Sequence, residues 1–453
     1  MFRLPSGTEM TIEILDKFLS DHKKEVTARY EPLYNAYKSD HDILHQQKKP
    51  AYKPDNRIVV NFPKYIVDTM LGFFIGNPIK ITAKDKAVSD FVDYTDQYND
   101  QDDNNAELAK IMSIFGKGHE TYYTDENSEL CITYLNPMEA FMIFDDSIVE
   151  RPMFFVRRYT DWEGNEFGEV RSSFGDRKFA TTGGTRWLDD DWQPHYFEGV
   201  PATEFIENEE RQGIFEPVLT MVNAYNKAIS EKANDVDYFA DAYLKILGVA
   251  LDENSVAHIR DNRIINFDGD EAGKLVVEFM NKPESDTTQE NLLERLERLI
   301  FAISMVANIS DENFGSATGV ALKYKLQAMS NLAKTKERKF TSGMNRRYKL
   351  LFSHPLSKVP ADAWVQLHYK FTPNIPANLL EEAQIAAQME GITSHKTQLT
   401  VLSIVDNVED ELKEIEEENK PVEKSPVDKM MFATTEKNTE VDTEDEEVID
   451  DEQ

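Results

Sequence analysis

The stretch that decides the fold is DENFGSATGVALKYKLQAMSNLAKTKERKF, residues 311–340. It opens acidic and glycine-bearing, then becomes a lysine-rich segment with apolar residues at helical spacing. At about 100° of rotation per residue, one narrow stripe of a helix starting after Gly319 is apolar. The stripe consists of Leu322, Leu326, Met329, Ala333, Phe340 and Met344. The pattern predicts a polar, hinge-like break at 308–318 and a long amphipathic helix over about 319–352.

This helix is basic within an acidic chain. Nine basic residues and one acid lie between Ala317 and Lys349, whereas the 453-residue chain carries a formal net charge of −33. Helical rotation places one basic group beside the apolar stripe and another on its far side. The first group is Lys323, Lys334 and Arg338, and the second is Lys325, Lys336, Lys339, Arg346 and Arg347. Two interpretations stay open: a solvated face, or a surface that meets acidic groups of a neighbouring subunit or a polyanion.

Composition narrows the class of protein. A single cysteine, Cys131, rules out an internal disulfide framework. The most apolar stretch, 65–81, contains Asp68 and a Gly-Asn-Pro break, and it is shorter than the roughly 20 residues of a membrane helix. The first residues lack the apolar core of a signal peptide. We expect a soluble protein whose negative charge disfavours general adhesion to nucleic acid or anionic membrane.

No motif for catalysis or metal binding is found. Residues 115–120, FGKGHE, do not form a phosphate loop, because Ile111 replaces the required glycine and Gly118 the required serine or threonine. The nine histidines lack paired spacing and cysteine partners, which disfavours a zinc site. The acidic run 189–191 is more typical of a solvated loop than of a cation site. We therefore expect no catalytic residue, no cofactor and no metal.

The element pattern predicts an α+β protein that is mainly α. The expected helices cover about 11–47, 63–75, 85–115, 217–247, 288–307 and 319–352, with two or three more between 376 and 419. Short β-rich runs over 119–200 predict an antiparallel sheet, and the alternation in 363–371 predicts one more strand. Residues 201–217 are expected to be a polar connector. The interval 249–284 is expected to be a compact insert with strands at 262–267 and 274–280.

Two of these helices have clear apolar stripes. The stripe of 217–247 includes Val222, Tyr225, Ile229, Ala233 and Val236, and the stripe of 288–307 includes Leu292, Leu296, Leu299, Ile303 and Val306. The helix 319–352 alone would span about 50 Å. Long helices joined by a small tip and a hinge fit a ring subunit better than a globular enzyme.

In order and spacing, several segments resemble the portal proteins of long-tailed phages that infect Gram-positive bacteria. The resemblance runs from about residue 10 to about 420. The segments are NRIVVNFPKYIVDTMLGFFIGNPIKI (56–81), YLNPMEAFMIFDD (134–146), FEPVLTMVNAYNKAISEKANDVDYFADAYLKILG (215–248), FGSATGVALKYKL (314–326) and VDNVEDELKEIEEE (405–418).

The resemblance implies a portal fold with wing, stem, clip and crown regions, assembled as a twelve-subunit ring. The implied regions are a wing at 1–215, stem helices at 216–248 and 285–307, a clip at 249–284, a tunnel loop at 308–318, a long helix with a wing strand at 319–375, a crown at 376–420 and a disordered acidic tail at 421–453. The tail has twelve acidic residues against three basic ones.

The resemblance also implies roles for particular residues. Double-stranded DNA would pass the tunnel loop without sequence specificity, and the clip would dock the terminase large subunit and later the head-completion adaptor. The loop residues are Asp311, Glu312, Asn313, Phe314, Gly315, Ser316, Ala317, Thr318 and Gly319; the clip candidates are Asp252, Glu253, Arg260, Arg263 and Lys274. Some clip residues could equally join subunit to subunit. From the basic helix, the candidates for an inter-subunit or DNA-facing surface are Lys323, Lys325, Lys334, Lys336, Arg338 and Lys339.

Further expectations concern partners and place. Scaffold and major capsid proteins are implied partners, membrane is not, and the protein would stand at the portal vertex of the virion after assembly in the host cytoplasm. The alternative is another head–tail connector or scaffold ring component without a packaging role. Such connectors are usually much smaller than this chain.

Overall fold

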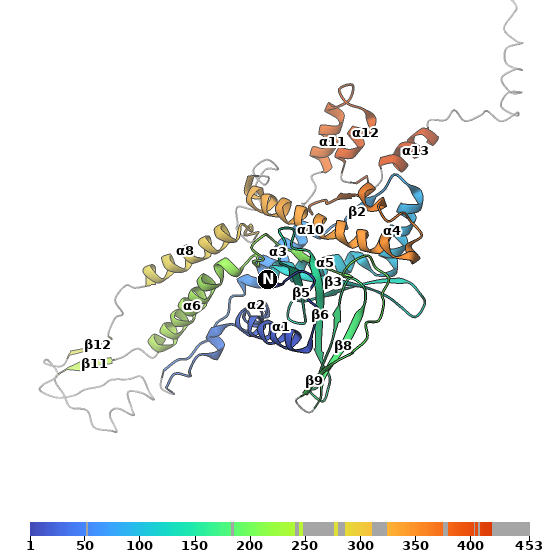
Figure 1. Cartoon of the computed structure of the whole chain (residues 1–453). Helices are drawn as coiled ribbons and strands as arrows, with labels where there is room; N and C mark the ends of the chain where they lie inside the picture. The colour runs from blue at the N-terminus through green and yellow to red at the C-terminus, as the bar shows by residue number, and fades with distance from the viewer. Residues whose placement is uncertain are drawn as a thin grey trace, which may run out of the picture. The chain divides into compact units, whose positions relative to one another are not determined.

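The computed structural model describes residues 1–50, 53–182, 185–240, 244–247, 276–279, 286–309, 324–374, 379–402, 404–405 and 408–418. These fall into two compact units, Met1–Asn374 and Ile375–Gln453. The expectation of an α+β fold that is mainly α is confirmed (Figure 1). The finer division into wing, stem, clip and crown stays a prediction. In the described part of the chain, no helix has both the length and the apolar character needed to cross a membrane.

The first unit contains most of the helices and all of the described strands. Its helices are α1 (Ile12–Glu25), a π turn (Val26–Tyr30), α2 (Glu31–Tyr37), α3 (Phe62–Ile75), α4 (Lys86–Tyr98), α5 (Gln101–Phe115), α6 (Leu219–Ala240), α8 (Asp286–Ser304) and α10 (Gln327–Ser353). Short 3₁₀ turns lie at Asp42–His45, Glu216–Val218, Pro355–Ser357 and Ala363–Gln366. In the second unit, the described helices are α11 (Leu379–Gln388), α12 (His395–Val401) and α13 (Val408–Glu418), as expected for the segment 376–419.

A six-stranded sheet has the order β1-β5-β6-β7-β8-β9, with β1 parallel to β5 and the other pairs antiparallel. Its strands are β1 (Phe2–Leu4), β5 (Ala140–Asp145), β6 (Pro152–Thr160), β7 (Glu166–Arg171), β8 (Asp176–Thr182) and β9 (Thr185–Leu188). Helix α1 packs Leu15, Phe18 and Leu19 against the buried side chains of one face. The antiparallel sheet predicted within 119–200 is therefore confirmed, although β1 was not anticipated.

A second sheet lies at the centre of the first unit. It has the order β10-β3-β4, formed by β10 (Ala202–Ile206), β3 (Lys117–Thr124) and β4 (Leu130–Leu135). Helix α10 packs on β10, where Gly343 allows the ring of Phe205 to approach; a Cβ at that glycine would lie 2.3 Å from the ring. Phe340 of α10 contacts Phe74, Phe205 and Phe371 in the same core. This sheet is the platform that holds α10.

Helices α6 and α8 lie side by side (Figure 1). Strand β11 (Leu244–Leu247) follows α6 and pairs antiparallel with β12 (Val276–Phe279), which precedes α8. The strand predicted at 274–280 is thus confirmed, whereas the one predicted at 262–267 lies outside the described residues. The helix predicted to reach residue 247 was too long, because its last residues pair as a strand.

Four other sequence predictions were wrong in detail. The single helix expected over 11–47 is interrupted and ends at Tyr37, apart from a 3₁₀ turn. The helix expected over 85–115 breaks at Asp100, which has a φ of 48°, while the Asn99 side chain binds the backbone of β4. The polar connector 201–217 contains the buried strand β10. The strand expected over 363–371 is a 3₁₀ turn followed by the three-residue β13 (His368–Lys370), which pairs with β2 (Lys80–Thr82).

Candidate functional site

The basic helix α10 is fastened to the second sheet by two buried ion pairs. The first joins Lys336 Nζ to Glu207 Oε2 at 2.6 Å, and both side chains are 1% exposed. Lys336 also donates to the Ala109 carbonyl at 3.0 Å and to Ser113 Oγ at 2.6 Å. Burial lowers the pKa of Lys336 and raises that of Glu207, and the attraction between the two charges opposes both shifts.

The second pair is a bidentate contact that lies closer to the C-terminal end of α10. Arg347 donates through Nε to Glu120 Oε2 at 2.9 Å and through Nη2 to Glu120 Oε1 at 2.5 Å, and both side chains are fully buried. Nη2 also reaches Asn105 Oδ1 at 2.7 Å. The hydroxyl of Tyr122 donates to the same carboxylate at 3.1 Å. The guanidinium is thus enclosed by α5, β3 and α10 itself.

These contacts correct the prediction for the basic helix. Lys336 was predicted on the solvent side as an inter-subunit or DNA-facing residue, but it is buried and paired within its own chain, as is Arg347. The assignment to the far side was wrong, because helical rotation places both residues on the buried side: Lys336 follows Ala333 by three residues, and Arg347 follows Met344 by three. Lys334 and Arg338 are exposed, and Lys339 pairs with Glu209 at 2.5 Å. Lys325 is exposed, and Lys323 lies outside the described residues.

A polar seam attaches helix α6 to an extended segment, residues 55–60. The backbone N–H groups of Asn56, Ile58 and Val60 donate to side-chain oxygens of α6. The acceptors are Asn234 Oδ1 at 2.6 Å, Ser230 Oγ at 2.9 Å and Asn226 Oδ1 at 2.8 Å. The donors are two residues apart in the extended segment, which is a distance of about 6.6 Å. The acceptors are four residues apart in the helix, which is about 6 Å. The similar spacings allow all three donors to meet an acceptor.

The seam was missed by the sequence analysis, although it has a signal. Asn226, Ser230 and Asn234 recur every four residues and are the buried positions after Val222 among the side chains of α6 that the structure describes. The predicted apolar stripe is offset from them: Tyr225 is half-buried, and Val236 is 63% exposed. A polar i, i+4, i+8 series in a long helix could have indicated the seam.

The residues just before this segment also contact α6. Asn223 Nδ2 donates to Asp42 at 2.8 Å, Lys49 Nζ pairs with Glu231 at 2.8 Å, and Asn226 Nδ2 lies 3.2 Å from the Nδ1 atom of His41. Contacts therefore follow α6 along several turns. We call the described residues 41–50 and 53–60 the strap.

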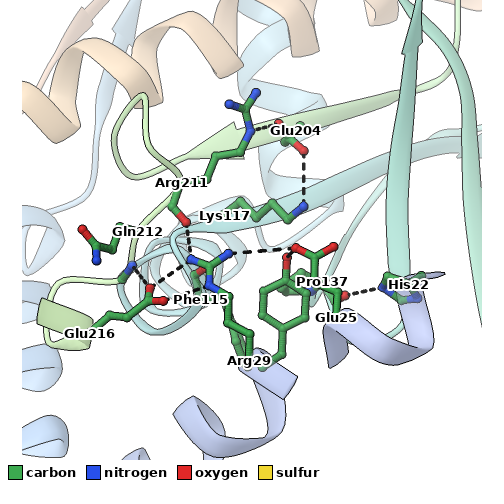
Figure 2. A network of polar contacts seen from close by, with 12 residues as sticks. His22, Glu25, Arg29, Phe115, Lys117, Pro137, Glu204, Arg211, Gln212 and Glu216 are labelled. Atoms are coloured by element: carbon green, nitrogen blue, oxygen red, sulfur yellow. Dashed lines mark hydrogen bonds and ion pairs between the residues drawn. The ribbon is translucent and has the colours of Figure 1, made fainter. Parts of the chain in front are cut away.

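A third polar network joins α1 and the π turn to the second sheet (Figure 2). Arg29 makes a forked contact with Glu216, at 2.9 Å from both Nε and Nη2, and donates to the Arg211 carbonyl at 2.6 Å. Arg211 Nε in turn donates to Glu204 at 2.8 Å. The Lys117 ammonium lies 3.9 Å from the same carboxylate. The N-terminal helices are thereby tied to β3, to β10 and to the residues just before α6.

Burial controls the charges in this network. Burial lowers the pKa of His22 to about 4, even though its Nε2 lies 2.7 Å from the Pro137 carbonyl. Burial also lowers the pKa of His119, whose ring nitrogens lack hydrogen-bond partners among the described residues. For Glu204, burial by itself raises the pKa, but His119, Lys117 and Arg211 outweigh it and hold the pKa below its usual range. The charged groups of this network are paired with one another: Arg29 with Glu216, and Lys117 and Arg211 with Glu204.

A pH-dependent contribution to stability is expected at Asp96. Burial raises its pKa to about 6, against the opposing effects of Arg347 and of the Tyr348 hydroxyl, which lies 2.9 Å away. The folded protein therefore keeps a proton that the unfolded chain releases, so this contribution falls as the pH rises from about 4 to about 6. Asp96→Asn is expected to raise the free energy of unfolding at pH 7.5 by about 1–2 kcal/mol and to leave it almost unchanged at pH 4. Urea unfolding at the two pH values checks this; an equal effect at both would contradict it.

The structure places few of the residues predicted for DNA and partner contacts. The tunnel-loop candidates, Asp311 to Gly319, and the clip candidates, Asp252 to Lys274, lie outside the described residues. Their roles stay predictions. On the described side of the loop, Met305 has a φ of 59° just after α8, and the backbone N–H of Ile309 donates to the Tyr65 hydroxyl at 2.8 Å.

Other residues that the sequence analysis considered for a functional site lie within regular secondary structure or at its ends. Gly116 ends α5 with a φ of 82°, and Gly118 lies in β3, so this glycine pair forms a helix stop and a strand. Cys131 is buried in β4. Among the described residues, no three His, Cys, Asp or Glu side chains are grouped to hold a metal ion.

Comparisons with known proteins identify the family. The family description "Phage portal protein, SPP1 Gp6-like" matches residues 16–425. The portal protein of Clostridium phage phiCD119 is 24% identical over 416 residues, covering 83% of this chain and 88% of that protein. The portal protein of Bacillus phage SPP1 is 24% identical over 408 residues, covering 83% and 79%. A solved structure titled "Neck of empty GTA particle computed with C6 symmetry" is 12% identical, with a TM-score of 0.48, and covers 83% of this chain and 93% of that one.

The class defined by these matches is the phage portal protein, a structural component of the virion at a vertex of the capsid. The chain belongs to the SPP1 Gp6-like family of portal proteins, since the match covers most of its length. The family predicted from the sequence is thereby confirmed.

Proposed function

We propose that copies of this chain form a ring through which double-stranded DNA enters and leaves the capsid. The observation that carries the proposal, beside the family, is the outward direction of apolar side chains on the two stem helices. On α6, Val236 is 63% exposed, and on α8, Leu292 and Ile303 are 49% and 45% exposed. The buried positions of α8 are instead Leu293, Ile300 and Ser304.

Part of each predicted stripe faces solvent. The polar seam continues the buried face of α6 beyond Val222, so Val236 is left toward solvent, as are Leu292 and Ile303 on α8. Exposed apolar residues repeated along neighbouring helices are typical of an interface. Copies standing side by side would cover them, and a head-to-tail arrangement that closes gives a ring.

The net negative charge of the chain favours the passage of DNA over its tight binding. Each phosphate that is neutralised releases counterions and strengthens binding, so many such contacts would hold the DNA back. The chain has 83 acidic and 50 basic residues, which gives general repulsion. In α10, the charges of Lys336 and Arg347 are neutralised in buried ion pairs. Lys334 and Arg338 remain available for weak contacts with DNA or a neighbouring subunit.

The remaining roles follow from the family. We infer that residues 311–319 line the narrow part of the channel and that the clip segment docks the terminase large subunit and then the head-completion adaptor. Scaffold and major capsid proteins would meet the assembled ring, which forms in the host cytoplasm as a homododecamer. We infer a structural role without catalysis. The alternative, a connector ring with no packaging role, differs in its effect on DNA content.

Electron microscopy of the purified chain tests the ring. Annular particles with a central opening are expected. A chain that stays monomeric across salt concentrations in which it is folded would contradict the proposal.

Deleting Glu312–Ser316 is expected to leave the ring intact and to reduce packaged DNA at least tenfold. The physical reason is that the loop is expected to contact the passing duplex rather than the neighbouring subunit. A nuclease-protection assay on heads assembled with the variant measures the effect. Full packaging would contradict the role of the loop, and loss of the ring would contradict its placement in the channel.

A further inference from the structure

The loop between β5 and β6 presents two apolar side chains to solvent. Ile148 is 100% exposed and Val149 is 63% exposed, and both are β-branched residues that normally lie in a core. Nothing in the fold of the single chain requires them there.

This loop is held in a fixed shape. The buried Asp145 accepts hydrogen bonds at Oδ1 from the Ser147 hydroxyl at 2.7 Å and from the Arg151 N–H at 2.8 Å. The backbone N–H of Asp145 donates to the Arg151 carbonyl at 2.8 Å, and Glu150, with a φ of 50°, forms an ion pair with Arg3. A loop ordered in this way loses little conformational entropy when it binds.

A groove with a mixed lining of aromatic, apolar and charged side chains lies near the opposite end of β6. Its charged members are Glu31, Lys38, Glu107, Lys110, Glu139 and Arg158. The groove has a volume of about 720 Å³ and runs between the π turn, α2, α5 and the end of β6. Tyr34 stacks on Phe115 with ring centroids 6.1 Å apart, and Tyr34 and Tyr159 are 38% and 49% exposed. Met138 and Ile111 contribute to the lining.

Position and charge make the loop and the groove complementary between copies. Residues 152 and 160 of β6 are about 26 Å apart, so the loop and the groove lie at opposite ends of this strand and cannot meet within one chain. A head-to-tail ring requires two different surfaces on opposite sides of the subunit. Lys38, at the groove, lies 4.8 Å from the ring centroid of Tyr34 and pairs with no carboxylate among the described residues. Asp146, on the loop, has no cationic partner there.

We propose that the β5–β6 loop of one copy inserts Ile148 and Val149 into this groove of the next copy, with Asp146 directed to Lys38. The contact would join the wings around the ring, separately from the contacts between stem helices. The inference rests on the proposed ring.

Disulfide cross-linking tests the contact. The double variant Ile148→Cys with Tyr34→Cys is oxidised, and covalent oligomers are counted on a non-reducing gel beside micrographs of the same sample. A ladder of oligomers is expected from the double variant and not from either single variant, all of which keep the buried Cys131. Rings without a ladder would overturn the insertion and leave the proposed function standing. Absence of rings from the unmodified chain would overturn both.

A charge substitution gives a second, independent test. Ile148→Asp is expected to raise the protein concentration needed for half-maximal assembly at least tenfold, while the folded monomer is unchanged by circular dichroism. Val365→Asp is the matched control, because Val365 is 67% exposed and lies in a 3₁₀ turn of the same unit. Equal effects of the two substitutions, or no effect of Ile148→Asp, would overturn the proposal.

Discussion

Replacing Arg347 by methionine is expected to lower the free energy of unfolding by about 3–5 kcal/mol, because Glu120 is left charged and fully buried. The pair has no access to water, and Asn105 and Tyr122 already use their groups on it. Methionine fills a similar volume, so the loss reflects charge more than a cavity. Chemical denaturation of the folded chain, followed by far-UV circular dichroism, measures the change.

Two control variants distinguish the effect of breaking a buried ion pair from the effect of removing any basic residue of α10. Lys339→Met removes the outer pair with Glu209 on the same helix and is expected to cost less than about 1 kcal/mol. The double variant Arg347→Met with Glu120→Gln is expected to recover a large part of the loss, since no bare charge stays inside. If Arg347→Met unfolds like Lys339→Met, the description of α10 as fastened through this pair is wrong.

Removing the three acceptors of the seam is the second large effect. Asn226→Ala, Ser230→Ala and Asn234→Ala together are expected to lower the free energy of unfolding by about 3 kcal/mol, about 1 kcal/mol for each backbone N–H left without a partner. The strap would detach from α6 before the core unfolds. Hydrogen exchange should therefore become much faster at the amides of Asn56, Ile58 and Val60.

Asn223→Ala is the matched control for the seam. It removes an asparagine from the same helix, but its partner is the side chain of Asp42 at the surface and no backbone group is orphaned. A change of less than about 0.5 kcal/mol is expected. Unchanged exchange at Ile58 in the triple variant would contradict the seam.

The long helices and the antiparallel sheet could be predicted from the sequence because their signals are local. The stripe through Met329, Ala333 and Phe340 is repeated often enough to fix a helix and its buried side. The helix boundary at Gly116 was equally plain, because a left-handed turn favours glycine.

What could not be predicted depends on contacts between distant segments. The partner of Lys336 is Glu207, which lies 129 residues away, and no local periodicity identifies it. Strand β10 was taken as a connector because its Thr203 and Glu204 are polar, yet both are buried beside partners on β3. On α6 and α8, the apolar stripes were recognised, but sequence alone gave no means of separating their buried members, such as Val222, from their exposed ones, such as Val236.

The neutral character of the seam has a consequence for how the particle is put together. Salt screens exposed charges, most strongly those farther apart than the Debye length of about 8–10 Å at moderate salt, but it scarcely affects hydrogen bonds between amides and hydroxyls. Helix α6 would therefore keep its register on the strap at salt concentrations that change the charged contacts between subunits. Dissociation and reassembly should then be reversible, with intact building blocks passing between the two states.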